Sequence, residues 1–281
     1  MNQEKSIIDL AREEQEGGAQ NSPNSSPASA PELNTGTFSN VPQDQDMQSA
    51  LEGLLENVHD KLKYVGVTLP SKGFFYGKKP EPVTVRPLTF DDERSLRNMN
   101  TDNMVSILST ILGACTKGVS IELLTPPDRL YLLFKIRELS YGDDYKLEQN
   151  CTNCGVKNSL TLKLSTLEID YLEEDYTTFT LPDSKKSVTI RVPRASQLEN
   201  IEMEVLMNDL YKYVESVENV VDGTVIQEFI RRTTVKDVDI LRNAIFIPPY
   251  GMEDKLMFNC MKCSQTTKAA VVMNEYFFTA N

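Results

Sequence analysis

The chain has 281 residues and a formal net charge of −12. This acidity argues against a broad nucleic-acid or anionic-membrane surface, because binding phosphate groups requires clustered Lys and Arg. The sequence contains no Trp and one His, His59, so a catalytic triad with an imidazole base has a single candidate. We interpret His59 as an exposed helix residue and predict that the protein is not an enzyme. No stretch reaches the roughly 18 apolar residues of a membrane-spanning helix, and we predict no contact with a membrane.

Residues 1–46 differ in composition from the rest of the chain. They contain eight acidic and two basic side chains and are rich in Ser, Pro, Asn and Gly from Gly17 onward. Such a segment buries too little apolar surface to offset its ordering entropy, so we predict a flexible, acidic, Ser/Pro-rich N-terminal arm. An arm that folds onto a partner is the alternative. The N-terminus lacks the apolar stretch of a signal peptide, and we expect the protein to remain in the compartment that makes it.

Residues 47–142 predict a mainly helical domain. From Met47, apolar residues recur at helical spacing in a one-sided stripe, which consists of Leu51, Leu54, Leu55, Val58 and Leu62. Further helices are predicted over 101–115 and 126–139. The second of these is apolar almost all round, so we expect it at the centre of a core.

Four helix starts carry recognisable capping residues, among them Ser196 and Glu199, which predict a capping box at the start of the 196–213 helix. Thr89 is followed three residues later by Asp92, and Thr234 is followed three residues later by Asp237. Thr125 precedes a proline at the first helical position, so we expect Thr125 to cap the 126–139 helix. These pairs predict where the helices begin.

A turn rich in Pro, Gly and aromatic residues lies between Val67 and Gly77. It contains Phe74, Phe75 and Tyr76, which form either an exposed binding loop or a plug of the core. The sequence leaves both interpretations open, and we take the three residues as candidate partner-binding residues.

Two strand–turn–strand units enclose the Cys-x-x-Cys pairs. The predicted strands are 145–150 and 156–164 around the first pair, and 256–259 and 266–273 around the second. Their segments, residues 143–165 and 255–281, predict one β module. Residues 166–254 between them predict an insertion, for which we expect a hairpin over 178–192, helices over 196–213, 225–232 and 235–246, and a turn at Asp222-Gly223.

The four cysteines Cys151, Cys154, Cys260 and Cys263 have the spacing of a metal site. A two-residue spacing lets a tight turn direct two thiolates at one ion, and two such turns facing each other supply the four sulfur ligands of structural zinc. We predict one structural zinc ion held by these four residues. Two disulfides and an iron–sulfur cluster are the alternatives. The fifth cysteine, Cys115, lies on the apolar face of a predicted helix and is interpreted as a buried hydrophobic residue.

Together these elements predict an α+β protein. A helical core over residues 47–142 is expected beside a zinc-ribbon-like β module made of the two Cys-x-x-Cys hairpins. The hairpin-and-helix insertion is expected to interrupt that module.

Two consecutive stretches carry a recognisable pattern: Leu69-Pro70-Ser71-Lys72-Gly73-Phe74-Phe75-Tyr76 and Val83-Thr84-Val85-Arg86-Pro87-Leu88-Thr89. With it the chain resembles the baseplate hub subunits and hub-assembly proteins of T4-like contractile-tailed bacteriophages. In that family a Leu-Pro-Ser-x-Gly-x-x-Tyr turn precedes a strand with Arg-Pro-Leu/Met-Thr and then an acidic capped helix. The resemblance is best over residues 65–140. The long N-terminal arm departs from the short family members, so no role is carried over to it.

The resemblance implies a structural component of a phage tail baseplate hub that organises protein–protein contacts at the tail tip during assembly. It implies other baseplate, central spike or tape-measure proteins as partners, several copies in the assembly, and no catalytic residue. The implied location is the virion tail, after folding in the host cytoplasm, where thiols stay reduced.

Two other functions compete with this expectation. A zinc-ribbon nucleic-acid-binding or transcription accessory protein would need a basic stripe beside the cysteine turns. The lysines near them are accompanied by acidic residues, so the charge there is mixed. An enzyme with a zinc-stabilised fold would need a well-placed His, a phosphate loop or a nucleophile pair, none of which the sequence pattern supplies.

Overall fold

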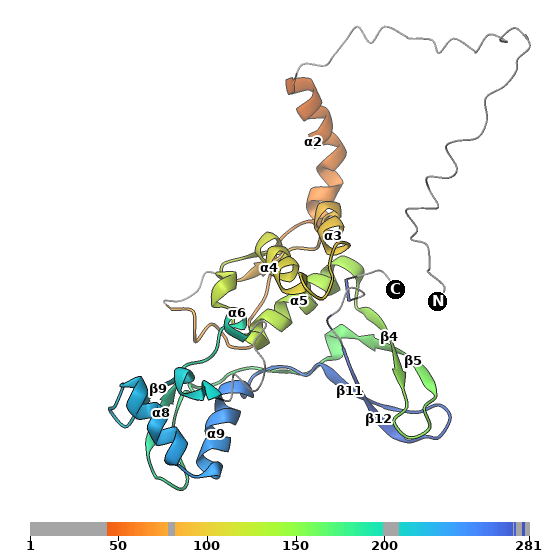
Figure 1. Cartoon of the computed structure of the whole chain (residues 1–281). Coiled ribbons are helices and arrows are strands. Elements are labelled where there is room, and N and C mark those ends of the chain that lie inside the picture. The colour runs from red at the N-terminus through yellow and green to blue at the C-terminus, as the bar shows by residue number, and fades with distance from the viewer. Residues whose placement is uncertain (1–43, 78–81, 199–207, 272, 274–276, 279–281) are drawn as a thin grey trace, which may run out of the picture. The chain divides into compact units, whose positions relative to one another are not determined.

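The computed structural model describes residues 44–77, 82–198, 208–271, 273 and 277–278 (Figure 1). The chain divides into two compact units, residues 1–50 and 51–281. The predicted N-terminal arm, residues 1–46, lies outside the described residues except for its last three, which begin a helix. No helix in the described part of the chain has the length and apolar character needed to cross a membrane.

Helix α2 (Asp44–Lys61) contains most of the predicted apolar stripe. The stripe residues Leu51 and Leu54 are 54% and 79% exposed, and Val58 is 40% exposed. Apolar periodicity therefore identified the helix, but among the described residues nothing covers most of its apolar side. The side chain of His59, which lies in this helix, is not among those described.

The first core is built around helix α5 (Pro126–Tyr141), which is buried on most of its circumference as its sequence predicted. Its neighbours are α3 (Phe90–Leu96), α4 (Met104–Cys115), the 3₁₀ turn η1 (Ile121–Leu123) and a three-stranded antiparallel sheet of β1 (Val65–Gly66), β2 (Thr84–Val85) and β3 (Thr116–Lys117). Thr89 and Asp92 form the expected capping box of α3. Cys115 is 0% exposed in this core, and burial raises its pKa to about 12.

The C-terminal aromatic residues complete this core. Phe277 is 0% exposed, and its ring lies 4.9 Å from that of Phe134 on α5. The guanidinium of Arg137, which is 1% exposed, donates from Nε to the carbonyl of Phe277 at 2.9 Å. An arginine on α5 thus holds a segment 140 residues later in the chain.

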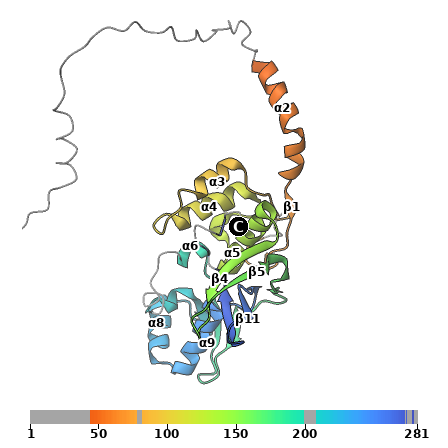
Figure 2. The same cartoon turned by 90° about the vertical axis from the view of Figure 1, so that its right-hand side faces the viewer.

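Two antiparallel hairpins follow the helical part, with the cysteine pairs in their turns. The first consists of β4 (Asp144–Asn150) and β5 (Lys157–Lys163), and the second of β11 (Lys255–Asn259) and β12 (Thr266–Ala270). Figures 1 and 2 show the two hairpins side by side. The chain leaves the first hairpin through the 3₁₀ turn η2 (Leu164–Thr166) and β6 (Ile169–Asp170), and it returns through β10 (Gly251–Met252), which pairs antiparallel with β6.

The insertion between β6 and β10 has its own core. A three-stranded antiparallel sheet of β7 (Thr178–Thr180), β8 (Ser187–Ile190) and β9 (Val214–Val217) packs with α8 (Gly223–Arg232) and α9 (Val235–Phe246). Fully or almost fully buried residues from these elements and the turn after β7 form this core, among them Leu181, Val188, Ile190, Ile226, Leu241 and Ile245.

Parts of the insertion differ from the sequence prediction. The helix expected over 196–213 is described as α6 (Ala195–Leu198) and the 3₁₀ turn η3 (Leu210–Tyr213), and residues 199–207 lie outside the described part. The predicted cap at Ser196 was wrong, because α6 begins one residue earlier and contains Ser196, while Glu199 lies outside the described residues. Asp222 does not form a hairpin turn. Its carboxylate accepts from the backbone amides of Thr224 and Val225, so it caps α8. An Asp-Gly pair is typical of both structures, and the following helical pattern decides between them.

The buried Asp237 links helix α9 to the β7–β8 turn. Its carboxylate accepts from the backbone amides of Asp183 and Ser184, both at 2.9 Å, and from the hydroxyl of Thr233 at 3.2 Å. Burial by itself would raise the pKa of Asp237, but these hydrogen bonds outweigh it and lower the pKa. Because the folded pKa lies below the unfolded value of about 3.9, the carboxylate stabilises the fold above that value and loses this contribution as pH falls through the folded pKa.

Asp237→Asn should therefore lower the stability of the chain at neutral pH and flatten the decline of stability in acid. Urea unfolding measured at pH values from about 3 to 7 tests this expectation. Asp239→Asn, which makes the same charge change on the same helix, is the control. Parallel stability curves for Asp237→Asn and the unsubstituted chain would contradict the proposed linkage.

Candidate metal centre

The four cysteine sulfurs of the two hairpin turns meet in one cluster. The Sγ atoms of Cys151 and Cys263 are 3.7 Å apart, and those of Cys154 and Cys260 are 3.6 Å apart. All four ligand atoms lie within 4.8 Å of one another, a group that could hold a metal ion. Each short distance joins the first cysteine of one turn to the second cysteine of the other turn. The two hairpins therefore contribute equally to the cluster.

These distances fit a single tetrahedral ion. A zinc–sulfur bond of about 2.3 Å places the corners of a tetrahedron about 3.8 Å apart. A disulfide requires about 2.05 Å between sulfurs, so neither close pair is bonded in this arrangement. An iron–sulfur cluster places several of its own atoms between its cysteine ligands and needs them farther apart.

Each turn is closed by the same backbone hydrogen bonds. In the first turn the amide of Cys151 donates to the carbonyl of Val156 at 2.9 Å, and the amide of Gly155 donates to the carbonyl of Cys151 at 3.0 Å. In the second turn the amide of Ser264 donates to the carbonyl of Cys260 at 2.9 Å. The strands on either side fix the ends of both turns, and this repeated geometry directs each pair of sulfurs to the same side.

The residue after the second cysteine has a left-handed backbone in both turns. Gly155 has φ of 70°, and Ser264 has φ of 58°. Glycine adopts this conformation without a steric penalty, whereas an L-residue such as Ser incurs a cost of about 1–2 kcal/mol. A Cβ added at Gly155 would meet nothing within 4 Å. At this position Ser would therefore be less favourable than Gly only because of the backbone conformation.

Ser264→Gly should accordingly raise the free energy of unfolding by up to about 1 kcal/mol, and Gly155→Ser should lower it by about 1 kcal/mol. Urea unfolding of the two variants measures both effects. Ser264→Ala keeps the strained backbone and removes only the hydroxyl, so it should behave like the unsubstituted chain. Equal stabilities of Ser264→Gly and Ser264→Ala would show that the turn is not strained.

The pKa values of Cys151, Cys154 and Cys260 are shifted by backbone amides and by the neighbouring sulfurs. Backbone amides of Cys154 and Asn153 lower the pKa of Cys151 to about 6, and backbone amides of Cys263 and Lys262 lower the pKa of Cys260. The amide of Val156 also favours the thiolate of Cys154, but burial and the neighbouring sulfurs raise its pKa to about 11. Thiolates this close repel one another, and a bound cation would remove that repulsion.

Two buried polar residues beside the sulfurs were not predicted from the sequence. Asn158 on β5 is 0% exposed, and Thr267 on β12 is 2% exposed. Each contacts a cysteine of the opposite hairpin at 3.8 Å. A polar residue at the same offset after each cysteine pair is the signal that could have identified them.

The three candidate partner-binding residues have different environments. Phe74 is 47% exposed. The ring of Phe75 packs against those of Tyr176 and Tyr250, with centroids 6.2 and 5.9 Å away. The hydroxyl of Tyr76 donates to the buried carboxylate of Asp128. Their role in binding a partner stays a prediction, for which Phe74 is the most accessible of the three.

The turn that carries these aromatic residues is held by Asp128 in the first turn of α5. This carboxylate is 0% exposed and accepts from the amide of Ser71 at 2.9 Å, from the hydroxyl of Tyr76, and from the hydroxyl of Thr125 at 3.1 Å. Burial raises the pKa of Asp128, although these hydrogen bonds oppose the shift. Thr125 occupies the N-cap position of α5 with Pro126 as the first helical residue, as predicted, but its hydroxyl donates to Asp128 and accepts no backbone amide of the helix.

Comparison with known proteins gives one result. A family model described as T4 bacteriophage base plate protein matches residues 62–279. This range includes both cores, the aromatic turn and all four clustered cysteines. No curated protein and no solved structure matches the chain significantly.

Proposed function

Because the chain belongs to the family of T4 bacteriophage base plate proteins, we propose that it is a non-enzymatic structural component of the baseplate hub. In this role it organises protein–protein contacts at the tail tip during assembly. Its partners are other baseplate, central spike or tape-measure proteins, and it is present in several copies. The family match over residues 62–279 carries the proposal, since it covers nearly all of the described structure.

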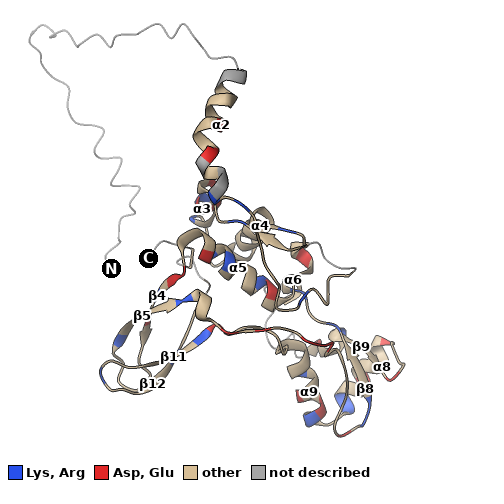
Figure 3. Cartoon of the chain, turned by 180° about the vertical axis from the view of Figure 1, so that it is seen from behind, with Lys and Arg blue, Asp and Glu red and all other residues tan. Residues whose placement is uncertain are grey.

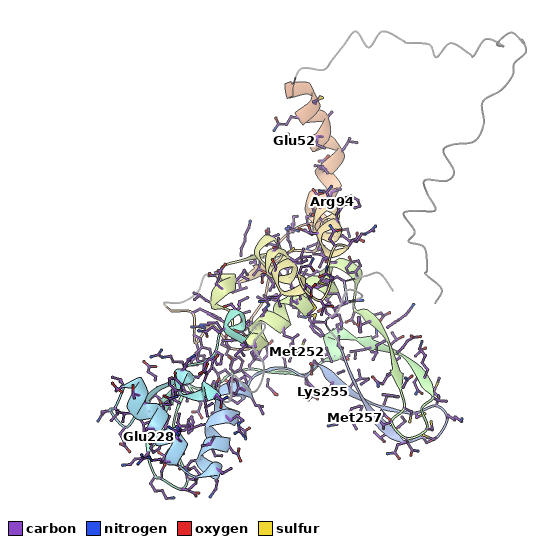
Figure 4. The ribbon with its side chains drawn as sticks, viewed as in Figure 1. Glu52, Arg94, Glu228, Met252, Lys255 and Met257 are labelled. Atoms are coloured by element: carbon purple, nitrogen blue, oxygen red, sulfur yellow. The ribbon has the colours of Figure 1, made fainter. Side chains whose placement is uncertain are left out.

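Exposed apolar side chains support a role in protein contacts. Phe74 on the aromatic turn, Met257 on β11 and Met261 in the second cysteine turn are 47%, 58% and 79% exposed. Figure 4 shows the side chains of both hairpins, with Met257 labelled. Large apolar side chains of this kind supply much of the binding energy where protein surfaces meet, whereas they contribute little to binding a phosphate backbone.

The four clustered cysteines are proposed to hold one structural zinc ion. Zinc would supply a closed tetrahedral centre with all four positions filled by protein sulfur, leaving no position for substrate. The chain's own contribution is to bring together two turns that are separated by the 105 residues between Cys154 and Cys260. Closing so long a loop costs chain entropy, and bonds across its ends offset that cost.

The charges on the hairpins favour a protein partner over a nucleic acid. Lys157 pairs with Glu148, and Lys163 lies 3.4 Å from Asp144. Figure 3 shows Lys and Arg mixed with Asp and Glu on and around these strands. A phosphate-binding surface requires basic side chains without such acidic neighbours. Because basic and acidic side chains lie next to one another on the hairpins, their charges support the hub proposal and not the zinc-ribbon nucleic-acid alternative.

Quantitative mass spectrometry of purified phage tails tests the proposed function. The chain should occur at a fixed ratio to other baseplate proteins, either in the mature tail or in a hub assembly intermediate. A duplex-DNA binding assay of the purified chain over a range of salt concentrations is the companion experiment. Absence from every tail particle and intermediate, together with salt-dependent binding to DNA, would overturn the proposal.

Elemental analysis with thiol titration tests the zinc ion separately. About one zinc per chain is expected, with four thiols becoming reactive when a chelator removes the metal. Four oxidised cysteines and no metal would show that the cysteines form disulfides and do not hold zinc. The hub proposal would then rest on the family match alone.

A further inference from the structure

The two cysteine hairpins are equivalent in their polar side chains as well as in their sulfurs. Cys151 and Cys260 are the first cysteines of their turns, and seven residues after them come Asn158 and Thr267. Both of these polar residues are buried in the strand that leaves the turn. Buried polar side chains require hydrogen-bonding partners, so the partners of Asn158 and Thr267 indicate what the two residues do.

Asn158 reaches from the first hairpin to the turn of the second. Its Nδ2 lies 3.8 Å from the Sγ of Cys260, and its Oδ1 accepts from the backbone amide of Met261 at 3.0 Å. Nδ2 also donates to the carbonyl of Val156 in its own turn at 2.9 Å. One side chain therefore joins the backbones of both turns and touches a sulfur ligand.

Thr267 makes the reciprocal contact. Its Oγ1 lies 3.8 Å from the Sγ of Cys151 in the first hairpin. Next to a thiolate the hydroxyl must be the donor, because the sulfur has no proton to give. The two sulfurs that receive these contacts are the buried ones, since Cys151 is 3% and Cys260 is 2% exposed.

We propose that Asn158 and Thr267 are a reciprocal pair of positioning residues, each donating from its own hairpin to the buried first cysteine of the other. The proposal rests on the zinc site proposed above. One divalent ion with four thiolates leaves two net negative charges in a largely buried place, and hydrogen bonds to the sulfurs disperse that charge. Because each donor crosses between hairpins, it also fixes the relative register of the two turns.

Thr267 provides the sharper test, because Thr267→Val removes the hydroxyl at nearly constant shape. Zinc affinity of the full chain is measured by competition with a chelator, and Co²⁺ substitution reports the sulfur environment through its absorption spectrum. Thr267→Val should weaken zinc binding about tenfold and shift the Co²⁺ spectrum. Thr267→Ser, which keeps the hydroxyl, should retain the zinc affinity and the Co²⁺ spectrum of the unsubstituted chain.

Neighbouring positions supply matched controls. Thr266→Val changes an exposed threonine on the same strand, whose hydroxyl donates to Asn259 at 2.9 Å, and should leave zinc affinity unchanged. Asn158→Asp removes the donor and adds a charge beside the sulfurs, so it should weaken zinc binding about 10–100-fold. Asn150→Asp adds the same charge at an exposed position next to the first turn and should have a much smaller effect.

The outcomes separate this proposal from the zinc site itself. If the unsubstituted chain binds zinc and both Thr267→Val and Asn158→Asp bind it with affinities within twofold of that chain, the positioning role is overturned and the zinc site stands. A chain that binds neither zinc nor Co²⁺ would overturn both. A spectrum shifted by Thr267→Val and restored by Thr267→Ser cannot come from a general loss of stability.

Discussion

Cys154→Ser is expected to abolish tight metal binding and to lower the free energy of unfolding by several kcal/mol. Removing one of four ligands undermines a site whose binding energy is folding energy, and structural zinc contributes about 10–16 kcal/mol of apparent binding free energy in zinc-finger peptides. The loss should be concentrated in the two hairpins, because the sulfurs join β4–β5 to β11–β12. Metal content, thermal melting and hydrogen exchange measure the effect.

Cys115→Ser is the matched control for this substitution. It makes the same atomic change at a cysteine in the helical core, 0% exposed and outside the sulfur cluster. It should keep one metal per chain, whatever its own cost in stability. Unchanged melting of Cys154→Ser would contradict a structural metal centre.

Asp128→Asn is expected to cost about 2–4 kcal/mol of stability, because buried donors left without an acceptor cost about 1–3 kcal/mol each. The carboxylate accepts from Ser71 on one oxygen and from Tyr76 and Thr125 on the other. An asparagine amide has one oxygen and one nitrogen, and the nitrogen cannot accept. At least one of these groups therefore loses its partner, and the aromatic turn should become less protected.

Urea unfolding and hydrogen exchange at the Ser71 amide measure this effect. Asp91→Asn, at an exposed acidic residue of α3, makes the same charge change and should cost little. The double variant Asp128→Asn with Tyr76→Phe should lose less than the sum of the two single losses, because both remove the same hydrogen bond. Additive losses, or a full-strength amide protection in Asp128→Asn, would show that Asp128 does not hold the turn.

The role of Asp128 also explains the sequence pattern that carried the family resemblance. Ser71 and Tyr76 in the Leu-Pro-Ser-x-Gly-x-x-Tyr turn are the residues that bind the buried carboxylate. Gly73 in the same turn has φ of 77°, a conformation that favours glycine. Much of the pattern thus specifies the shape of the turn. Among the three aromatic residues of the turn, Phe74 is the exposed one, at 47%.

The sequence alone predicted the elements whose signals are local. The capping pairs Thr89–Asp92 and Thr234–Asp237 lie within one helical turn, and both begin a helix in the structure. The strands predicted on either side of each cysteine pair form both hairpins in the structure, since the two-residue spacing of the cysteines is typical of a tight turn. The α+β class follows from these signals. The exposed stripe of α2 marks their limit, since periodicity identifies an apolar face and not what covers it.

Apart from the predicted meeting of the two cysteine turns, only the tertiary structure decided which residues far apart in the chain are in contact. It pairs Cys151 with Cys263 and Cys154 with Cys260, and it brings Asn158 to a turn more than 100 residues later. Arg137 likewise reaches the carbonyl of Phe277. Local propensity and periodicity act over a few residues, whereas these contacts depend on how two cores, an insertion and two hairpins pack together. The sequence by itself therefore identified the four cysteines that cluster, and the packing of distant segments determined which polar residues lie beside them.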